Sequence, residues 1–225
     1  MRQPDTTLVK VWDIPTRVFH WLLVALVVAL AVTGQTGALG WHLVLGPAVL
    51  VLVLFRLAWG LMGSETSRFP HFLRRPADIL AYVRAARTGA VRSVGHNPLG
   101  GLNVVAMLLL LLAQAATGLF ASDDILTEGP LAHLVTAATV KAMTGLHHLG
   151  FKLLLVLVGL HLAAVAFYRF AKKDDMVSAM VTGRKRVPSG IAGIRFVNPL
   201  WALAILAAFA ALVWGGLAAF PPPAY

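Results

Sequence analysis

Five long apolar runs alternate with polar connections along this chain. A helix needs about 20 apolar residues to cross roughly 30 Å of hydrocarbon. Each run has about that length, and no run contains Asp or Glu. The pattern therefore predicts an all-α transmembrane fold with five spanning helices, at residues 18–36, 42–61, 99–120, 146–170 and 196–220.

Composition supports the membrane class. The chain is 59% hydrophobic and 12% charged, and its mean hydropathy is +0.80, which is too apolar for an ordinary soluble domain. The length leaves room for one helical domain. Most of the six tryptophans lie near run ends, as the aromatic belts of membrane proteins do.

The net charge of +10 is unevenly distributed along the chain, and this distribution predicts how the protein is oriented in the membrane. Most Lys and Arg residues lie at 1–17, 62–98 and 171–195, whereas 37–41 has none and 121–145 has only Lys141. The positive-inside rule places the basic segments in the cytoplasm and the C-terminus in the periplasm. The basic residues then set the orientation of the protein in the membrane and contact lipid headgroups. No nucleic-acid partner is therefore expected.

This orientation divides the chain into segments. Two short interfacial helices are also expected, at 77–87 on the inner face and at 130–144 on the outer face. The fifth run carries no histidine and no charge, so it reads as an addition to a four-helix core. The expected order is a cytoplasmic N-terminus (1–17), the four-helix core (18–170), a basic linker (171–195), the fifth helix (196–220) and a periplasmic tail (221–225).

Histidines at membrane depth are the main candidates for chemistry. An ionisable residue inside a span is rare and marks a functional site by default. His147 and His161 are 14 residues apart in one run. That spacing returns to within roughly 40° of the same helix face after a rise of about 21 Å. One helix thus presents two imidazoles at two depths.

The first two runs repeat this spacing independently. His20 lies about 18 residues before the turn between them and His42 about 4 after it, so their depths also differ by about 14 residues, or roughly 21 Å. An antiparallel bundle puts His20 level with His161, and His42 level with His147. The sequence predicts two irons, each held by a histidine pair between facing helices.

Other uses of intramembrane histidines remain open. A single such histidine often makes a helix–helix hydrogen bond. A proton or metal-ion transport path is a second alternative, although such paths usually recruit carboxylates, which the runs lack. Because the chain has no Cys, any haem is non-covalent haem b, and iron–sulfur clusters with Cys ligands are excluded.

Four further residues are candidates for cofactor binding. Gly46 and Gly150 lie near the ligand face, where a missing side chain lets a flat macrocycle approach, or where helices simply pack closely. Arg56 is 14 residues after His42, level with the inner pair, where it pairs with a haem propionate or quinone oxygen, or extends to the interface. The same two alternatives, propionate or interface, apply to Lys152.

These residues resemble the bacterial cytochrome b561 family and its nickel–iron hydrogenase-type cytochrome b branch. The resemblance covers roughly residues 8–170. It is carried by the R-x-x-H-W start at Arg17–Trp21, by His42 with Gly46 and Arg56, by His161, and by the segments WDIPTR at 12–17, GHNPLG at 95–100 and LHH at 146–148.

The resemblance implies an inner-membrane cytochrome of bacteria with two haem b groups and a bound quinone. It also implies electron transfer between the quinone pool and a redox partner, such as a hydrogenase-like subunit or a c-type cytochrome. Two imidazoles on each iron leave no open position, which favours electron transfer over catalysis at iron. A stand-alone oxidoreductase acting on a small species such as superoxide is the alternative.

Overall fold

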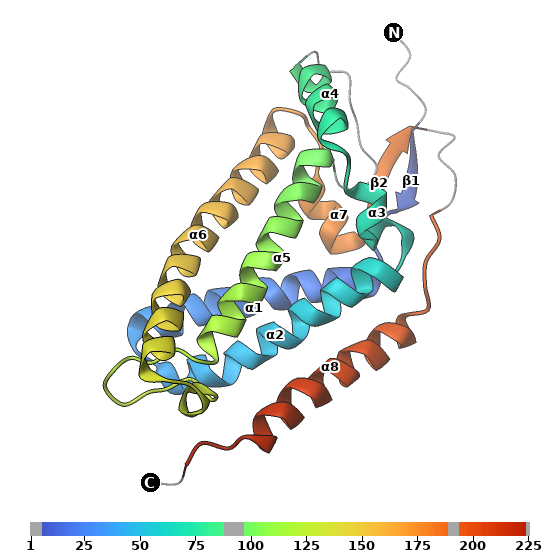
Figure 1. Ribbon diagram of the computed structural model, residues 1–225. Helices are drawn as coiled ribbons and strands as arrows, with labels where there is room; N and C mark the ends of the chain where they lie inside the picture. The colour runs from blue at the N-terminus through green and yellow to red at the C-terminus, as the bar shows by residue number, and fades with distance from the viewer. Residues whose placement is uncertain (1–5, 88–96, 189–193, 224–225) are drawn as a thin grey trace.

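The computed structural model describes residues 6–87, 97–188 and 194–223. In this part of the chain, five helices are long and apolar enough to cross a membrane, which confirms the predicted fold class. They are α1 (Ile14–Thr36), α2 (Leu39–Met62), α5 (Pro98–Gly118), α6 (Ala137–Phe170) and α8 (Pro199–Ala219) (Figure 1).

Short elements connect the spans. A helix expected at 77–87 is present as α4, and its place at the membrane interface stays a prediction. A two-stranded antiparallel sheet was not predicted; it pairs Thr6 with Pro188 and Lys10 with Arg184. The short elements are β1 (Thr6–Lys10), η1 (Glu65–Ser67), α3 (Phe69–Phe72), α4 (Pro76–Arg87), η2 (Ala132–Leu134), α7 (Met176–Thr182) and β2 (Arg184–Pro188).

Polar caps set where the spanning helices begin. Asp13 accepts a hydrogen bond from the Thr16 amide at 2.9 Å, so α1 begins before the apolar run does. Asn97 caps α5 in the same way, accepting from the Gly100 amide at 2.7 Å, with Pro98 in the first turn. Pro is tolerated there because a first-turn amide has no helical acceptor.

The prediction of a separate outer helix at 130–144 is wrong. Only the short η2 lies in the first half of that segment, and Thr136 then caps α6, which runs unbroken from Ala137 to Phe170. No Pro interrupts residues 137–146, so the polar first turns and the apolar run form one helix. Helix α6 therefore extends beyond the apolar stretch on the predicted outer side.

The spans form an antiparallel bundle with one additional helix. Helix α2 packs on α1 and α5, and α5 packs on α6, whereas α1 and α6 approach each other less closely. Helix α8 packs mainly on α2, outside these four (Figure 1). An apolar layer of Val49, Val53, Leu111 and Leu154 fills the middle of the bundle.

A folded cap closes the end of the bundle that carries the basic segments. The Gly183 carbonyl accepts from the amides of Val11 at 2.7 Å and Trp12 at 3.1 Å. Arg17 donates to the Met180 carbonyl at 3.3 Å and also to the Val181 carbonyl, at the end of α7. The chain before α1 and the segment after α6 therefore fold together, where the sequence suggested only a tail and a linker.

Helix α8 is fixed at its start. The Ser64 hydroxyl accepts from the Val197 amide at 3.1 Å, and a Glu65 carboxylate oxygen accepts from the Arg195 amide at 3.0 Å. These bonds tie the start of α8 to the segment that follows α2. Ser64 is fully buried, so the contact excludes water.

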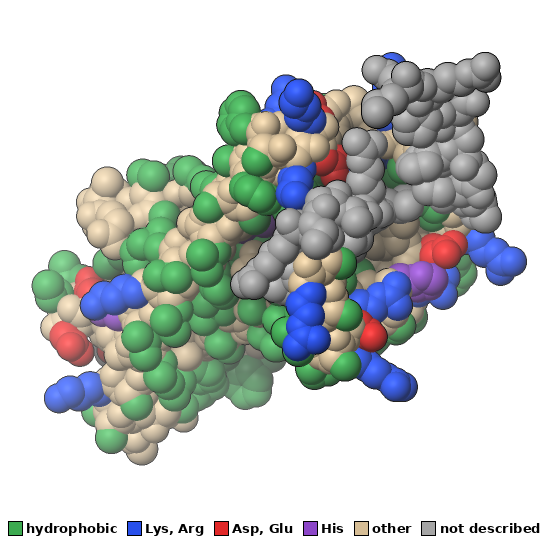
Figure 2. All heavy atoms as spheres, turned by 90° about the horizontal axis from the view of Figure 1, so that it is seen from above, with side chains coloured by type: hydrophobic (Ala, Val, Ile, Leu, Met, Phe, Trp, Pro, Cys, Tyr) green, Lys and Arg blue, Asp and Glu red, His purple; other side chains and the backbone are tan. Residues whose placement is uncertain are grey.

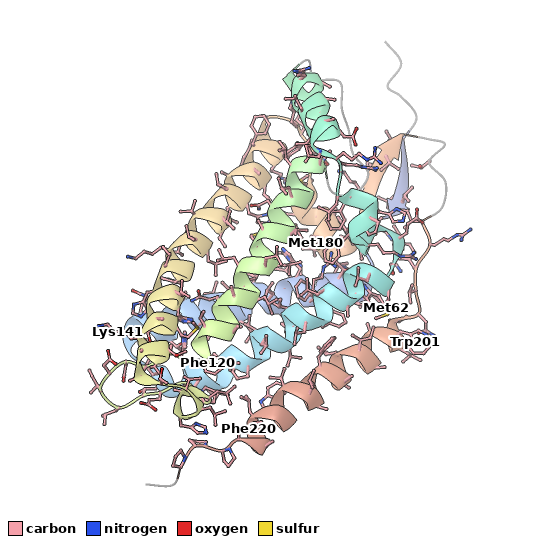
Figure 3. All side chains as sticks on the ribbon, viewed as in Figure 1. Met62, Phe120, Lys141, Met180, Trp201 and Phe220 are labelled. Carbon is pink, nitrogen blue, oxygen red and sulfur yellow. The ribbon has the colours of Figure 1, made fainter. Side chains whose placement is uncertain are left out.

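The two ends of the bundle differ. Met62, Met180 and Trp201 mark the end that carries the small sheet, and Phe120, Lys141 and Phe220 mark the other end (Figure 3). Hydrophobic side chains cover the stretch between groups of charged side chains, as a lipid-facing surface requires (Figure 2). Trp59 departs from the expected aromatic belt, because it is 0% exposed and lies in the core.

Candidate functional site

His42 of α2 and His147 of α6 face each other across the bundle. Their ring centroids are 6.1 Å apart and the ring planes are inclined by 81°. Metal–imidazole bonds of about 2 Å place the two ring centres of a bis-imidazole metal roughly 6 Å apart. The predicted outer pair is therefore brought together at a spacing that suits one metal ion between the rings.

The Nδ1 atom of His42 is held by helix α1. It lies 3.1 Å from the Leu30 carbonyl oxygen and 3.3 Å from the Thr33 hydroxyl. A carbonyl oxygen only accepts, so His42 Nδ1 carries the proton and donates. The lone pair of the neutral ring then lies on Nε2.

The Nδ1 atom of His147 is held in the same way by helix α5. It donates to the Gln114 carbonyl at 3.0 Å and lies 3.4 Å from the Thr117 hydroxyl. Metal-binding histidines usually donate their other ring N–H to a carbonyl or carboxylate, which fixes the tautomer. Both outer histidines therefore have the protonation pattern of metal ligands.

A cavity of about 500 Å³ adjoins these two rings. Its walls include His42, His147, Gly46, Gln114 and Lys152. Cavities of roughly 300–1,000 Å³ are typical of cofactor and ligand sites. Most of the remaining wall is apolar, which suits a flat, mainly hydrophobic ring system.

The two candidate glycines have different surroundings. Among the described residues, no heavy atom lies within 4 Å of the position that a Cβ on Gly46 would take, so Gly46 leaves open space in the cavity wall. At Gly150 that position is occupied by the Gln114 side-chain oxygen. Gly46 has the geometry expected beside a macrocycle, whereas Gly150 accommodates a neighbouring side chain.

The mouth of the cavity carries charged and titratable groups. His148 and Lys152 line it from α6, and Asp123 and Glu128 line it from the loop after α5. Three backbone amides, from Thr127, Ile125 and Leu126, donate to the Asp123 carboxylate. These bonds hold the pKa of Asp123 below its ordinary value, so the carboxylate stays charged at neutral pH.

His20 of α1 and His161 of α6 form the second pair. They lie close enough to interact electrostatically. The Nδ1 atom of His20 is buried and has no hydrogen-bond partner among the described residues. The two inner histidines are thus neighbours, but His20 lacks the carbonyl contact that holds His42 and His147.

Helix α6 separates the two levels. His147 and His161 lie on one face, and Leu154 is halfway between them, seven residues from each. Leu154 is buried in the apolar layer with Val49, Val53 and Leu111. The two histidine levels are thus about 21 Å apart along α6, with packed hydrocarbon between them.

Arg56 lies inside the protein. Its side chain is 2% exposed, it lies over the Phe69 ring at 5.2 Å, and it interacts electrostatically with Asp13. Its Nη1 atom is buried without a hydrogen-bond partner among the described residues. Asp13 is itself buried, and it accepts from the Trp59 indole N–H at 3.0 Å.

The sequence singled out the four histidines and Arg56 as candidates, but it did not indicate the groups that contact them. Asp13 and Trp59 are 46 residues apart, and nothing in the sequence indicates their contact. Thr-Gly pairs at 33–34 and 117–118 lie near the ends of two predicted spans, but the sequence does not indicate which side chains they contact. His96, the histidine of the GHNPLG segment noted in the sequence, lies outside the described residues.

A comparison with known protein families matches most of this chain. The family model of the prokaryotic cytochrome b561 proteins matches residues 11–183. The chain belongs to the prokaryotic cytochrome b561 family. It is therefore a membrane b-type cytochrome of electron transfer, and its family typically binds haem b. The matched residues take in α1 to α7 and all four histidines, and they end before α8. A search of curated proteins finds no match.

Proposed function

We propose that this cytochrome moves electrons across the bacterial inner membrane through two haem b groups, between the quinone pool and a redox partner. The outer haem is held by His42 and His147, and the inner haem by His20 and His161. The observation that supports this most strongly is the outer pair, in which two imidazoles face each other beside a cavity of about 500 Å³.

The donor set fits a bis-imidazole iron. Both outer rings carry their proton on Nδ1, which leaves Nε2 of each ring for the metal. A haem iron with two imidazole ligands cycles between ferric and ferrous states without an open coordination position. Apolar side chains exclude water from the interior, and Gly46 leaves room beside the cavity.

Two cations suit the carboxylates of haem. Lys152 lines the outer cavity, and its ammonium group offers an ion pair to a propionate there. Arg56 has a buried N–H without a partner among the described residues, which offers a donor to an inner propionate or a quinone oxygen. Asp13 interacts electrostatically with Arg56 and offsets part of the cost of burying its charge. Gly150 contributes by accommodating the Gln114 side chain beside the outer ligand.

The outer surface favours a protein partner over a small anion. Asp123 and Glu128 lie at the mouth of the outer cavity. A negative potential there repels superoxide and attracts a carrier with a basic surface. A hydrogenase-like subunit or a c-type cytochrome fits this role, and quinone then exchanges electrons at the edge of a haem.

Paired histidine variants test the proposal. His42→Ala and His147→Ala should each remove the same haem, seen as the same missing component in the visible spectrum and in a redox titration. His20→Ala and His161→Ala should both remove the other one. Reduction of the remaining haem by a quinol analogue reports whether electrons enter from quinone.

The matched control is His71→Ala, because His71 lies on the surface outside the spans. This variant should keep the full spectrum and the full quinol reaction. If His20→Ala removes the same component as His147→Ala, the pairing is wrong. If every variant keeps the wild-type spectrum, the histidines are not ligands and the proposal fails.

A further inference from the structure

The outer histidines occupy two sites of the same construction. In the first, His42 meets the Leu30 carbonyl, the Thr33 hydroxyl and Gly34; in the second, His147 meets the Gln114 carbonyl, the Thr117 hydroxyl and Gly118. The three groups stand at the same spacing along α1 and α5. We call each set of three groups a histidine seat.

Each threonine has the same hydrogen-bond pattern. Thr33 donates to the Ala29 carbonyl at 2.8 Å, and Thr117 donates to the Ala113 carbonyl at 2.8 Å. Because each hydroxyl proton is used within its own helix, the hydroxyl oxygen presents a lone pair to the histidine Nδ1–H. Each Nδ1–H therefore lies between two acceptors, a carbonyl and a hydroxyl oxygen.

Each glycine lets the ring approach the helix backbone. A Cβ on Gly34 would lie 3.2 Å from His42 Cε1, and a Cβ on Gly118 would lie 3.0 Å from His147 Cε1. Both distances are shorter than ordinary van der Waals contact between carbon atoms. A methyl group at either position would force the imidazole to rotate or to move away from its carbonyl.

We propose that the two seats, Thr33–Gly34 and Thr117–Gly118 with their carbonyls, orient the outer ligands and fix their ring planes close to perpendicular. The proposal rests on haem ligation by His42 and His147, as argued above. The rings are inclined by 81°, and among the described residues the Nδ1 atom of each ring bonds to the carbonyl and hydroxyl of its own seat. Donation from Nδ1–H to an acceptor also increases the basicity of Nε2, which stabilises the ferric state.

The inner pair provides an internal comparison. His20 Nδ1 has no acceptor among the described residues, so its ring plane and basicity are not set by such a seat. Changes in the seats should therefore affect the outer haem alone. In a single variant, the midpoint potential and spectrum of the inner haem thus serve as the reference for those of the outer haem.

Electron paramagnetic resonance of the purified ferric cytochrome is the first test. Near-perpendicular axial imidazoles give a strongly anisotropic low-spin signal, with its low-field g value above that of parallel planes. The outer haem should show such a signal. A rhombic signal typical of parallel planes, assigned to the outer haem by its absence in His42→Ala, overturns the proposed orientation.

Substitution of the seats is the second test. Thr33→Val and Thr117→Val keep the side-chain shape but remove one acceptor, so the midpoint potential of the outer haem should rise. The inner potential should stay unchanged, and Thr33→Ser should restore the original value. Gly34→Ala and Gly118→Ala should shift the low-field g value of the outer signal or remove the outer haem.

Matched controls come from the same helices. Thr36 makes the same bond to its own helix, to the Val32 carbonyl at 2.9 Å, but it is exposed and makes no hydrogen bond to a histidine among the described residues. At Gly40, no described heavy atom lies within 4 Å of the position that a Cβ would take. Thr36→Val and Gly40→Ala should behave as wild type. Should Thr33→Val and Thr117→Val match Thr36→Val in potential and spectrum, the seats have no such role.

The proposed function and the role of the seats fail by different results. A wild-type protein that folds without haem refutes the proposed function itself. A wild-type protein with an intact outer haem, whose potential and signal do not respond to the threonine changes, refutes the seats alone. The threonine variants are near-isosteric, so this distinction holds even if a glycine variant fails to fold.

Discussion

Arg56 places a positive charge in the interior, on the helix that also carries His42. Burial of such a charge is costly, and Asp13, which interacts with it electrostatically, offsets part of that cost. Asp13 in turn is held by the Trp59 indole and by the first turn of α1. One buried acid thus links the start of α1, the end of α2 and the cation.

Arg56→Gln should lower the midpoint potential of the inner haem and leave the outer one unchanged. The ferric state carries one more positive charge, so removing a nearby cation stabilises it. Unit charges roughly 7 Å apart at an effective dielectric of about 20 interact by about 2 kcal/mol, and Asp13 offsets part of this. We expect a shift of tens of millivolts in a redox titration. Arg75→Gln, on the exposed surface, is the control. Equal potentials in both variants would mean that Arg56 has no electrostatic role at the haem.

Trp59→Phe should destabilise the protein without changing haem content. It removes the indole donor and leaves a buried Asp13 oxygen with one partner fewer, at a cost of about 1–3 kcal/mol. Thermal unfolding of the detergent-solubilised cytochrome measures this. Trp201→Phe is the control, because Trp201 is 65% exposed on α8. Equal melting temperatures for the two variants would show that the Asp13 contact adds no stability.

At the residue scale, sequence reasoning found the groups that are chemically unusual for their depth. The histidines and Arg56 stand out because polar residues are rare in apolar runs. Thr33, Gly34, Thr117 and Gly118 do not stand out, since small residues are common in membrane helices. Their role depends on which ring they touch, and that contact joins different helices.

At the scale of elements, hydropathy located all five spanning helices, but it did not locate their ends. Helix α1 begins at Ile14 because Asp13 caps it, and α6 extends back to Ala137 through polar turns. The paired strands were missed because β1 and β2 have five residues each and no clear alternation of apolar residues. Their pairing joins segments that are distant in the sequence.

Gly183→Ala should loosen the cap formed by α7, β1 and β2. Gly183 has φ +78°, a conformation that costs an L-residue about 1–2 kcal/mol. An added Cβ would also lie 2.9 Å from Arg17 Nη1 and from the Trp12 carbonyl. Limited proteolysis of the cap should become faster than in Gly40→Ala, the control in open space. Unchanged proteolysis would show that the cap does not depend on this turn.

At the scale of the whole molecule, the two proposed haem sites lie at different depths of a protein whose orientation in the membrane is predicted from its charges. Five candidate spans with basic segments at one end lead, by the positive-inside rule, to the prediction of a cytoplasmic N-terminus and a periplasmic C-terminus. A reporter fused after Tyr225 should therefore be active in the periplasm. Activity in the cytoplasm would mean that one of the five helices does not span, and α8 would be the first candidate.

Haem stoichiometry tests the central claim most directly. Two histidine pairs, each with one iron, predict close to two haem b groups per chain, both six-coordinate and low-spin. A pyridine haemochrome assay against protein mass measures this ratio in the purified cytochrome. A ratio near two is the expected result. A ratio near one requires that one pair be given up, and a ratio near zero in well-folded protein contradicts the claim that these histidines hold haem.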